Sequence, residues 1–336
     1  MATIKDVARL AGVGIGTASR VVSGRGSVAP GTAERVRKAI EALEFRPSHA
    51  ARVLLSGSSQ MIGVYIPILK GTFYTPLLQA IDTELRSAGL HMVVAFGCGT
   101  GDARQQAVEG IEFLIERGCD GLVVMSNVIQ PADLEVLRQK QGQAVFVNHW
   151  FAELPEQCFR ADHVAGGRLA AQALLQHGHR RLALIAGPDY APDNLLRVQG
   201  FLDELALAGI ARHEVALIES DFSPEGGWSS AQRLVDGGAQ FTGLFCANDE
   251  MAVGALSYFQ QVGISVPAQV SVLGYDDTHS AEYSAPRLSC VHIPWTDITL
   301  NGLRWLLNTC YGAKNPVQRD FPVSLHWRAS VAKAPG

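Results

Sequence analysis

The feature that most constrains the fold is an alternation, from residue 61 onward, of short apolar runs with amphipathic segments of helical length. A first set of runs lies at residues 62–68, 91–96, 121–125 and 144–148, with helices expected up to Ala88 and over 103–117 and 131–139. A second set lies at residues 181–187, 214–220, 242–247 and 269–275, with helices over 193–208, 225–236 and 249–262. Such alternation is typical of parallel sheets covered on both faces, so two sets predict an α/β domain with two lobes.

The first residues predict a separate, all-α structure. Thr3 and Asp6 are spaced as a capping box for a first helix, and Gly12 ends that helix. The apolar residues of this helix share one face at i, i+3, i+4 and i+7 spacing: Ile4, Val7, Ala8 and Ala11. A helix, a glycine turn and a second helix place the second helix where it can enter the major groove of DNA.

Two more helices complete this N-terminal structure. The second has Arg20 on its polar face, and its inward side comprises Ala18, Val21 and Val22. The third runs roughly from Pro30 to Leu43 and closes a small core. Residues 45–60 then contain Pro47, a possible short helix over 48–55 and a polar Gly-Ser-Ser run, so they predict a hinge between domains.

The distribution of charge supports a DNA-binding N-terminus. Residues 1–60 carry nine Lys or Arg against four acids, a net charge of +5, whereas the remainder carries −9. Attraction to phosphates is therefore confined to the N-terminal segment.

Composition excludes several classes of protein. The 336 residues suggest two or three domains, 47% are hydrophobic, and no apolar run reaches the length of a membrane span. Met1 leads directly into a charged amphipathic helix rather than a signal peptide, so we expect a cytoplasmic protein. The six cysteines form no C-x-x-C pair and indicate neither a zinc site nor a disulfide framework. No cofactor is expected.

The run TIKDVARLAGVGIGTASRVVSG resembles the headpiece of the lactose/galactose repressor (LacI/GalR) family of bacterial transcription regulators. Two residues depart from that family's pattern. Gly14 and Ala29 stand where the family usually has serines that cap helices, and such a cap is typically worth about 1 kcal/mol. Glycine costs only a few tenths of that at a cap position, so we expect the headpiece to fold.

The resemblance implies a fold and a domain organisation. It implies an all-α helix-turn-helix headpiece over residues 1–46, a hinge helix and linker over 47–60, and an effector-binding and dimerisation domain over 61–336. The last is expected to share the two-lobed, parallel-sheet fold of periplasmic binding proteins. The chain would cross between lobes near residues 159–163, 288–293 and 320–325, with its last strand near 323–328.

The resemblance also implies which residues contact DNA. These are Thr3, Ile15, Gly16, Thr17, Ser19 and Arg20 in the headpiece, with Ala51 and Leu54 in the hinge. Leu54 matches a leucine that wedges into the minor groove and bends the duplex. A plain amphipathic helix pair and a plain flexible linker are the alternatives.

Polar residues follow several apolar runs, where open α/β sheets bind their ligands. Asn248 follows one run and Asp276 follows another, while Arg197 lies on a predicted helix. Aromatic residues in neighbouring loops could cover the apolar face of a sugar ring: Phe73, Trp150, Phe222 and Trp295. By resemblance, the effector-binding residues are Phe73, Asn148, Arg197, Phe222, Asn248, Asp276 and Trp295.

Each of these residues also has a structural interpretation. Asn248 could simply cap a helix, Asp277 is better explained as a cap or an interlobe partner than as a ligand, and Arg197 could be a surface charge. Trp295 could belong to the core. Lys70 and His149 also fall in candidate pocket loops.

Enzyme classes fit poorly. Gly97, Gly99 and Gly101 follow a strand, but the G-x-G-x-x-G spacing of a dinucleotide site fails. No G-x-S-x-G elbow or metal-spaced histidine pair is present. A secreted sugar-binding protein would share the lobes but would need a signal peptide and no basic helix-turn-helix.

The sequence therefore predicts a homodimeric regulator, most simply a repressor, that reads a near-palindromic double-stranded operator and is controlled by a small sugar bound between the lobes. A purine is the alternative effector and a sugar acid the third. Asp276 argues against an anion, because two like charges would meet in the site.

Overall fold

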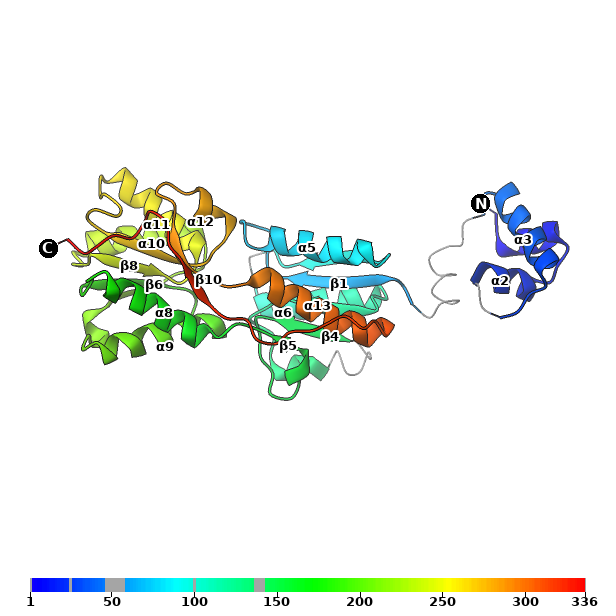
Figure 1. The fold of residues 1–336 in the computed structure, drawn as a ribbon, viewed down its shortest axis with the longest axis horizontal. Coiled ribbons are helices and arrows are strands. Elements are labelled where there is room, and N and C mark those ends of the chain that lie inside the picture. The colour runs from blue at the N-terminus through cyan, green and yellow to red at the C-terminus, as the bar shows by residue number, and fades with distance from the viewer. Residues whose placement is uncertain (1, 24–25, 46–57, 99–100, 136–142, 336) are drawn as a thin grey trace. The chain divides into compact units, whose positions relative to one another are not determined.

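The computed structural model describes residues 2–23, 26–45, 58–98, 101–135 and 143–335 (Figure 1). The chain divides into two compact units. One comprises Met1–Met61 with Gly118–Asp120, and the other comprises Ile62–Arg117 with Gly121–Gly336.

The N-terminal unit contains three helices, α1 (Ile4–Ala11), α2 (Ile15–Ser23) and α3 (Pro30–Ala42). Thr3 and Asp6 form the predicted capping box, and Gly12 ends α1 in the left-handed region at φ 63°. The helices enclose a small core whose most buried members are Val7, Ala8, Ala11, Ala18, Val36 and Ala39. The first four of these residues lie on the faces that the sequence predicted to be buried, and Val36 and Ala39 show that the third helix closes the core as expected.

The predicted hinge helix lies outside the described residues, and so do Ala51 and Leu54. The described chain resumes at Ser58. There, the backbone amides of Ser59 and Gln60 donate to the carboxylate of Asp120 at 2.8 and 2.9 Å, and the Ser58 hydroxyl donates to it at 2.6 Å. One carboxylate therefore fixes three successive residues that lead into the first strand.

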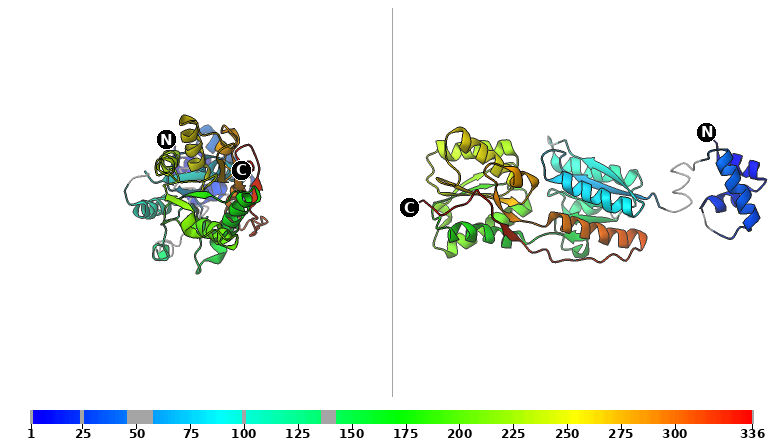
Figure 2. Two further views of the ribbon diagram at one scale, coloured as in Figure 1. Left: turned by 90° about the vertical axis from the view of Figure 1, so that its left-hand side faces the viewer. Right: turned by 45° about the horizontal axis from the view of Figure 1, so that its top comes forward.

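The second unit is built on two sheets, with helices on both faces of each (Figure 2). The first sheet has the order β2-β1-β3-β4-β5, and its strands are β1 (Met61–Ile66), β2 (His91–Phe96), β3 (Gly121–Val124), β4 (Ala144–Val147) and β5 (Cys158–Phe159). The helices of this lobe are α5 (Tyr74–Ser87), α6 (Ala103–Glu116) and α13 (Trp295–Tyr311). Strand β3 pairs in parallel with both β1 and β4, as the sequence predicted.

The second sheet has the order β11-β10-β9-β8-β6-β7. Its strands are β6 (Leu182–Ala186), β7 (Ala216–Glu219), β8 (Gly243–Cys246), β9 (Ser271–Asp276), β10 (Ser289–His292) and β11 (Ser324–His326). The helices of this lobe are α8 (His163–Gln176), α9 (Pro192–Leu207), α10 (Pro224–Asp236), α11 (Asp249–Gln261) and α12 (His279–Tyr283).

The chain passes between lobes three times, near the predicted positions. It leaves β5 of the first sheet for α8 of the second lobe, returns from β10 to α13, and passes again from α13 to β11. The last strand, β11, lies within the range predicted for it, and it pairs antiparallel with β10 in an otherwise parallel sheet. The chain leaves the second lobe at the end of β10 and comes back from the first lobe into β11. Strand β11 therefore starts beside the end of β10 and runs in the opposite direction, whereas parallel neighbours need a crossover within one lobe.

Two further differences concern local structure. The helix predicted over 131–139 begins as a 3₁₀ turn, η1 (Pro131–Asp133), and residues 136–142 lie outside the described residues. Two other short 3₁₀ turns, η2 (Pro155–Gln157) and η3 (Arg212–Glu214), lie in connections. No described helix combines the length and apolar character that a bilayer crossing needs.

Candidate DNA-binding and effector-binding sites

Helix α2 has one exposed face, and it carries the residues predicted to read DNA. Ile15 is 49% exposed although it is large and apolar, and Gly16 and Arg20 are exposed beside it. Thr17 and Ser19 are half-buried at the edges of this face, whereas Ala18 on the opposite side is fully buried. Thr3 lies apart, at the N-terminus of α1, where its hydroxyl donates to Asp6.

The two departures from the family pattern leave two helix starts without side-chain caps. The carbonyl of Gly14 accepts the amides of Thr17 and Ala18, and no side chain is available there to satisfy another donor. Ala29 precedes α3 and makes no side-chain capping bond. The headpiece retains its three helices because burial of the shared core supplies most of their stability.

Arg197 is the centre of the candidate effector site. Its side chain is 3% exposed on α9, so it is not the surface charge that the sequence left open. Its Nη1 donates to the carbonyl of Ala247 at 2.6 Å and its Nη2 donates to Asp193 at 2.7 Å. Its Nε is buried and has no hydrogen-bond partner among the described residues. An unpaired buried donor is costly, so this atom is a candidate contact for a ligand oxygen.

Close packing of α8 against α9 fixes the backbone of Arg197. A Cβ atom on Gly167 of α8 would lie 2.1 Å from the carbonyl oxygen of Arg197, and one on Gly200 of α9 would lie 2.1 Å from that of Val164. Only glycine allows so close an approach at either position. The two helices therefore meet backbone to backbone beneath the site.

Asp276 ends β9 beside Arg197, with its carboxylate 3.8 Å from Nη2. Its backbone has φ 103°, which turns the chain sharply at the end of the strand. The indole Nε1 of Trp295 donates to the carboxylate at 3.2 Å. Burial raises the pKa of Asp276 to about 7, against the opposing attraction of Arg197, so its charge changes within the physiological pH range.

Asp193 is a central residue that the sequence reasoning missed. It is 5% exposed and accepts hydrogen bonds from Asn127 at 2.9 Å and Asn148 at 3.1 Å, both in the other lobe. Burial opposes its ionisation, but Arg197 and the other donors outweigh that cost and lower its pKa. The spacing of Asp193 and Arg197, four residues apart on one predicted helix, was a signal that could have identified the pair.

A chain of hydrogen bonds links the lobes through His163, which the sequence reasoning also missed. Its Nε2 lies 2.6 Å from Asn148 Oδ1, and its Nδ1 lies 3.0 Å from the hydroxyl of Tyr275. Since Asn148 uses its NH₂ group to donate to Asp193, its Oδ1 accepts and His163 Nε2 carries the proton. Burial lowers the pKa of His163 to about 3, so the ring is neutral and accepts from Tyr275. No sequence pattern marks this residue, because its partners are 15 and 112 positions away.

Three of the four predicted aromatic residues, Phe73, Phe222 and Trp295, lie around this polar cluster. The rings of Phe73 and Trp295 meet edge to face at 5.2 Å, and Trp295 is 6% exposed in the core as well as bonded to Asp276. Phe222 has a backbone φ of 64°. The guanidinium carbon of Arg197 lies 5.8 Å from the centre of the Phe222 ring and 4.3 Å from the centre of the Tyr275 ring. Trp150 is 45% exposed and stacks on Arg160 instead.

Asn248 has the structural role that the sequence left open. Its Oδ1 accepts the amide of Met251 and caps α11, and its Nδ2 donates to the carbonyl of Phe222. It therefore orders the loop that carries Phe222, and a direct contact with a ligand stays a prediction. Lys70 pairs with Glu225 at 3.0 Å across the lobes. Asp277 belongs to a second network, because its carboxylate bonds to Cys290, His292 and Arg328.

The chain thus combines a small helix-turn-helix unit with a two-lobed α/β unit of the kind that binds ligands between its lobes, which defines a ligand-responsive DNA-binding regulator. Residues 3–48 match the family described as "Bacterial regulatory proteins, lacI family", and residues 171–331 match the periplasmic binding protein-like domain. The HTH-type transcriptional regulator GalR of Escherichia coli (strain K12) is 32% identical over 88% of this chain and 85% of its own length. The chain belongs to the LacI family.

Solved structures agree with this assignment. A LacI-family transcriptional regulator from Burkhoderia phymatum is 53% identical, with a TM-score of 0.79, over 81% of this chain and 99% of its own. The lac repressor dimer bound to operator and the anti-inducer ONPF is 26% identical, with a TM-score of 0.81, over 98% of this chain and 99% of its own. The function of the chain is therefore regulatory rather than enzymatic.

Proposed function

We propose that this chain is a transcriptional repressor in which α2 reads an operator and a sugar binds at the cluster around Arg197. The observation that carries the effector site is the buried Asp193–Arg197–Asp276 group, in which Arg197 Nε has no hydrogen-bond partner in the part of the chain that the structure describes. All three residues belong to the second lobe, and side chains of the first lobe, Asn127, Asn148 and Trp295, donate hydrogen bonds to them. The group therefore lies where the two lobes meet, at strand ends and helix starts of the kind where open α/β sheets bind ligands.

Sugar hydroxyls fit this group because each hydroxyl both donates and accepts. Arg197 Nε offers a donor, and the carboxylates of Asp193 and Asp276 offer acceptors. Phe222 and Phe73 supply apolar rings for the sugar's carbon face. A sugar acid would bring its charge against two carboxyl groups, one of them at a pKa near 7, so we rank it below a neutral sugar. A purine remains the alternative effector.

The effector test is a calorimetric screen of neutral sugars, sugar acids and purines against the full chain. Asp193→Asn should weaken binding of any sugar at least tenfold, because it removes the charge that holds Arg197 in place. Asp203→Asn, on the exposed side of the same helix, is the matched control and should bind normally. Tight binding of a purine with no binding of any sugar would replace the sugar by a purine in this proposal. Equal sugar affinities of the Asp193→Asn and Asp203→Asn variants would contradict the placement of the effector site.

The DNA-binding role rests on the exposed face of α2 and on the charge of +5 in residues 1–60. We propose that two chains form a homodimer that reads a near-palindromic operator in the cytoplasm, with residues 1–46 as the headpiece, 47–60 as the hinge and 61–336 as the effector domain. Leu54 would act as the minor-groove wedge. Leu54→Ala should then reduce DNA bending in a circular-permutation gel shift while sugar binding stays unchanged, and equal bending would exclude the wedge.

A further inference from the structure

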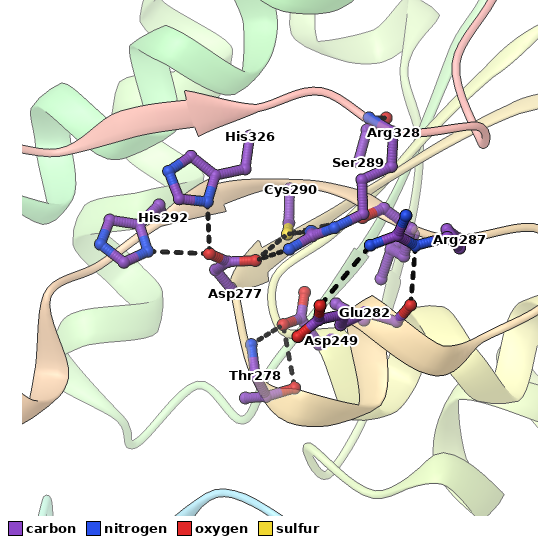
Figure 3. A network of polar contacts seen from close by, with 12 residues as sticks. Asp249, Asp277, Thr278, Glu282, Arg287, Ser289, Cys290, His292, His326 and Arg328 are labelled. Carbon is purple, nitrogen blue, oxygen red and sulfur yellow. Dashed lines mark hydrogen bonds and ion pairs between the residues drawn. The ribbon is translucent and has the colours of Figure 1, made fainter.

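A second polar cluster lies on the second lobe, outside the effector site (Figure 3). Asp277 follows β9, His292 ends β10, and His326 ends β11, so three neighbouring strands bring them together. The carboxylate Oδ2 of Asp277 lies 2.9 Å from Nδ1 of His292 and 2.5 Å from Nδ1 of His326. The two imidazole rings stack at 4.4 Å with an angle of 10° between their planes.

The remaining contacts of Asp277 orient its carboxylate. Its Oδ1 accepts from Arg328 Nη2 at 2.6 Å and from the Cys290 thiol at 3.2 Å. Arg328 is itself held by the carbonyl of Leu288 at 2.8 Å. Arg328 therefore occupies Oδ1, and Oδ2 points at the two imidazoles. Metal ligands in proteins are commonly oriented by outer hydrogen bonds of this kind.

The three ligand atoms lie close enough together for one metal ion. All three lie within 4.8 Å of one another. A tetrahedral zinc ion with bonds of 2.0–2.2 Å needs ligand atoms about 3.3 Å apart, so the two short contacts must open by less than about 1 Å. The necessary freedom exists, because the side chain of His326 is 45% exposed and that of His292 is 31% exposed.

A hollow of about 450 Å³ lies beside the cluster. It is lined by Arg287, Leu325, His326, Trp327, Arg328 and Ala329. His326 and Arg328 line this hollow and also belong to the polar cluster, so the hollow borders the cluster on the side of His326.

We propose that Asp277, His292 and His326 form a binding site for a divalent transition-metal ion such as Zn²⁺, with water completing its coordination. Two imidazoles and one carboxylate favour such ions over Mg²⁺ or Ca²⁺, which prefer oxygen ligands. The ion would join three segments: the end of β10, the end of β11 and Asp277, which follows β9. The chain leaves this lobe after β10 and re-enters it at β11. Metal binding would therefore stiffen two of the three interlobe connections.

The experiment measures Zn²⁺ affinity of the full chain by competition with a chromophoric chelator, with melting temperature as a second readout. The expected result is one Zn²⁺ per chain and a rise in melting temperature, with Mg²⁺ giving neither. A His292→Ala/His326→Ala double variant should bind Zn²⁺ at least tenfold more weakly. The six cysteines are common to both proteins, so any binding by thiols cancels in the comparison.

His213→Ala is the matched control, because His213 is exposed on η3 and lies outside the cluster. It should bind Zn²⁺ as the parent does. The double variant should melt near the parent's temperature without metal, since both substituted side chains are partly exposed. Equal Zn²⁺ affinity in the parent and the double variant would overturn the proposal, and so would an equal response to Mg²⁺.

Discussion

Substitution of Gly167 by alanine tests how the effector site is positioned. The new Cβ would lie 2.1 Å from the carbonyl oxygen of Arg197. Carbon–oxygen contacts are comfortable at about 3.3 Å, so α8 and α9 must separate by roughly 1 Å. Arg197 and Asp193 would move together with α9, but the residues to which they are hydrogen-bonded lie on other elements and would not move with them. The 2.6 Å bond from Arg197 to Ala247 and the bonds from Asn127 and Asn148 to Asp193 would be stretched or lost.

The magnitude follows from overpacking, which typically costs about 1–3 kcal/mol. For a unit of this size, roughly 2–4 °C of melting temperature is lost per kcal/mol. We therefore expect Gly167→Ala to lower the melting temperature of the full chain by about 2–12 °C and to weaken effector binding at least tenfold.

Differential scanning calorimetry measures the first effect and titration calorimetry the second. Gly302→Ala is the matched control, because it is also a glycine-to-alanine change inside a helix. Its Cβ would sit at ordinary contact, 3.4 Å from Phe159, and alanine favours helix, so this variant should melt at or above the parent's temperature. A Gly167→Ala protein that melts and binds like the parent would refute the argument that close helix packing positions Arg197.

Three further predictions concern the headpiece and Asp276. Arg20→Ala should lose a base contact and weaken operator binding by about 1–3 kcal/mol in a gel-shift titration. Arg35→Ala is the control, because Arg35 is exposed on α3 and its loss should lower the affinity for all DNA sequences alike. Unchanged operator affinity for Arg20→Ala would exclude α2 as the reading helix. Ala29→Ser should add a missing cap worth about 1 kcal/mol and slow hydrogen exchange in α3, and faster or equal exchange would contradict this. Because the pKa of Asp276 rises to about 7 on folding, the folded chain holds an extra proton between about pH 4 and 7. Its unfolding free energy should therefore fall as pH rises through that window, and Asp276→Asn should remove this component of the slope in urea titrations.

Local signals in the sequence were sufficient for the headpiece and for most of the strands. The i, i+3, i+4, i+7 spacing of Ile4, Val7, Ala8 and Ala11 predicts a buried face because helical geometry alone places those residues together. The left-handed turn at Gly12 follows equally from the residue type. The antiparallel return of β11 was not predictable in this way, because strand direction depends on which lobe the chain has just left.

The sequence by itself determined the class of this protein: a basic helix-turn-helix of residues close in the chain, and βα units whose order sets two mostly parallel sheets. Only the tertiary structure decided which polar residues share a site. Asn148, His163, Asp193 and Tyr275 come from both lobes, and Asp277, His292 and His326 come from three strands. Periodicity reports only which face a residue occupies within its own element. The crossings between lobes bring distant faces together, so the donors and acceptors that meet there are set by tertiary packing.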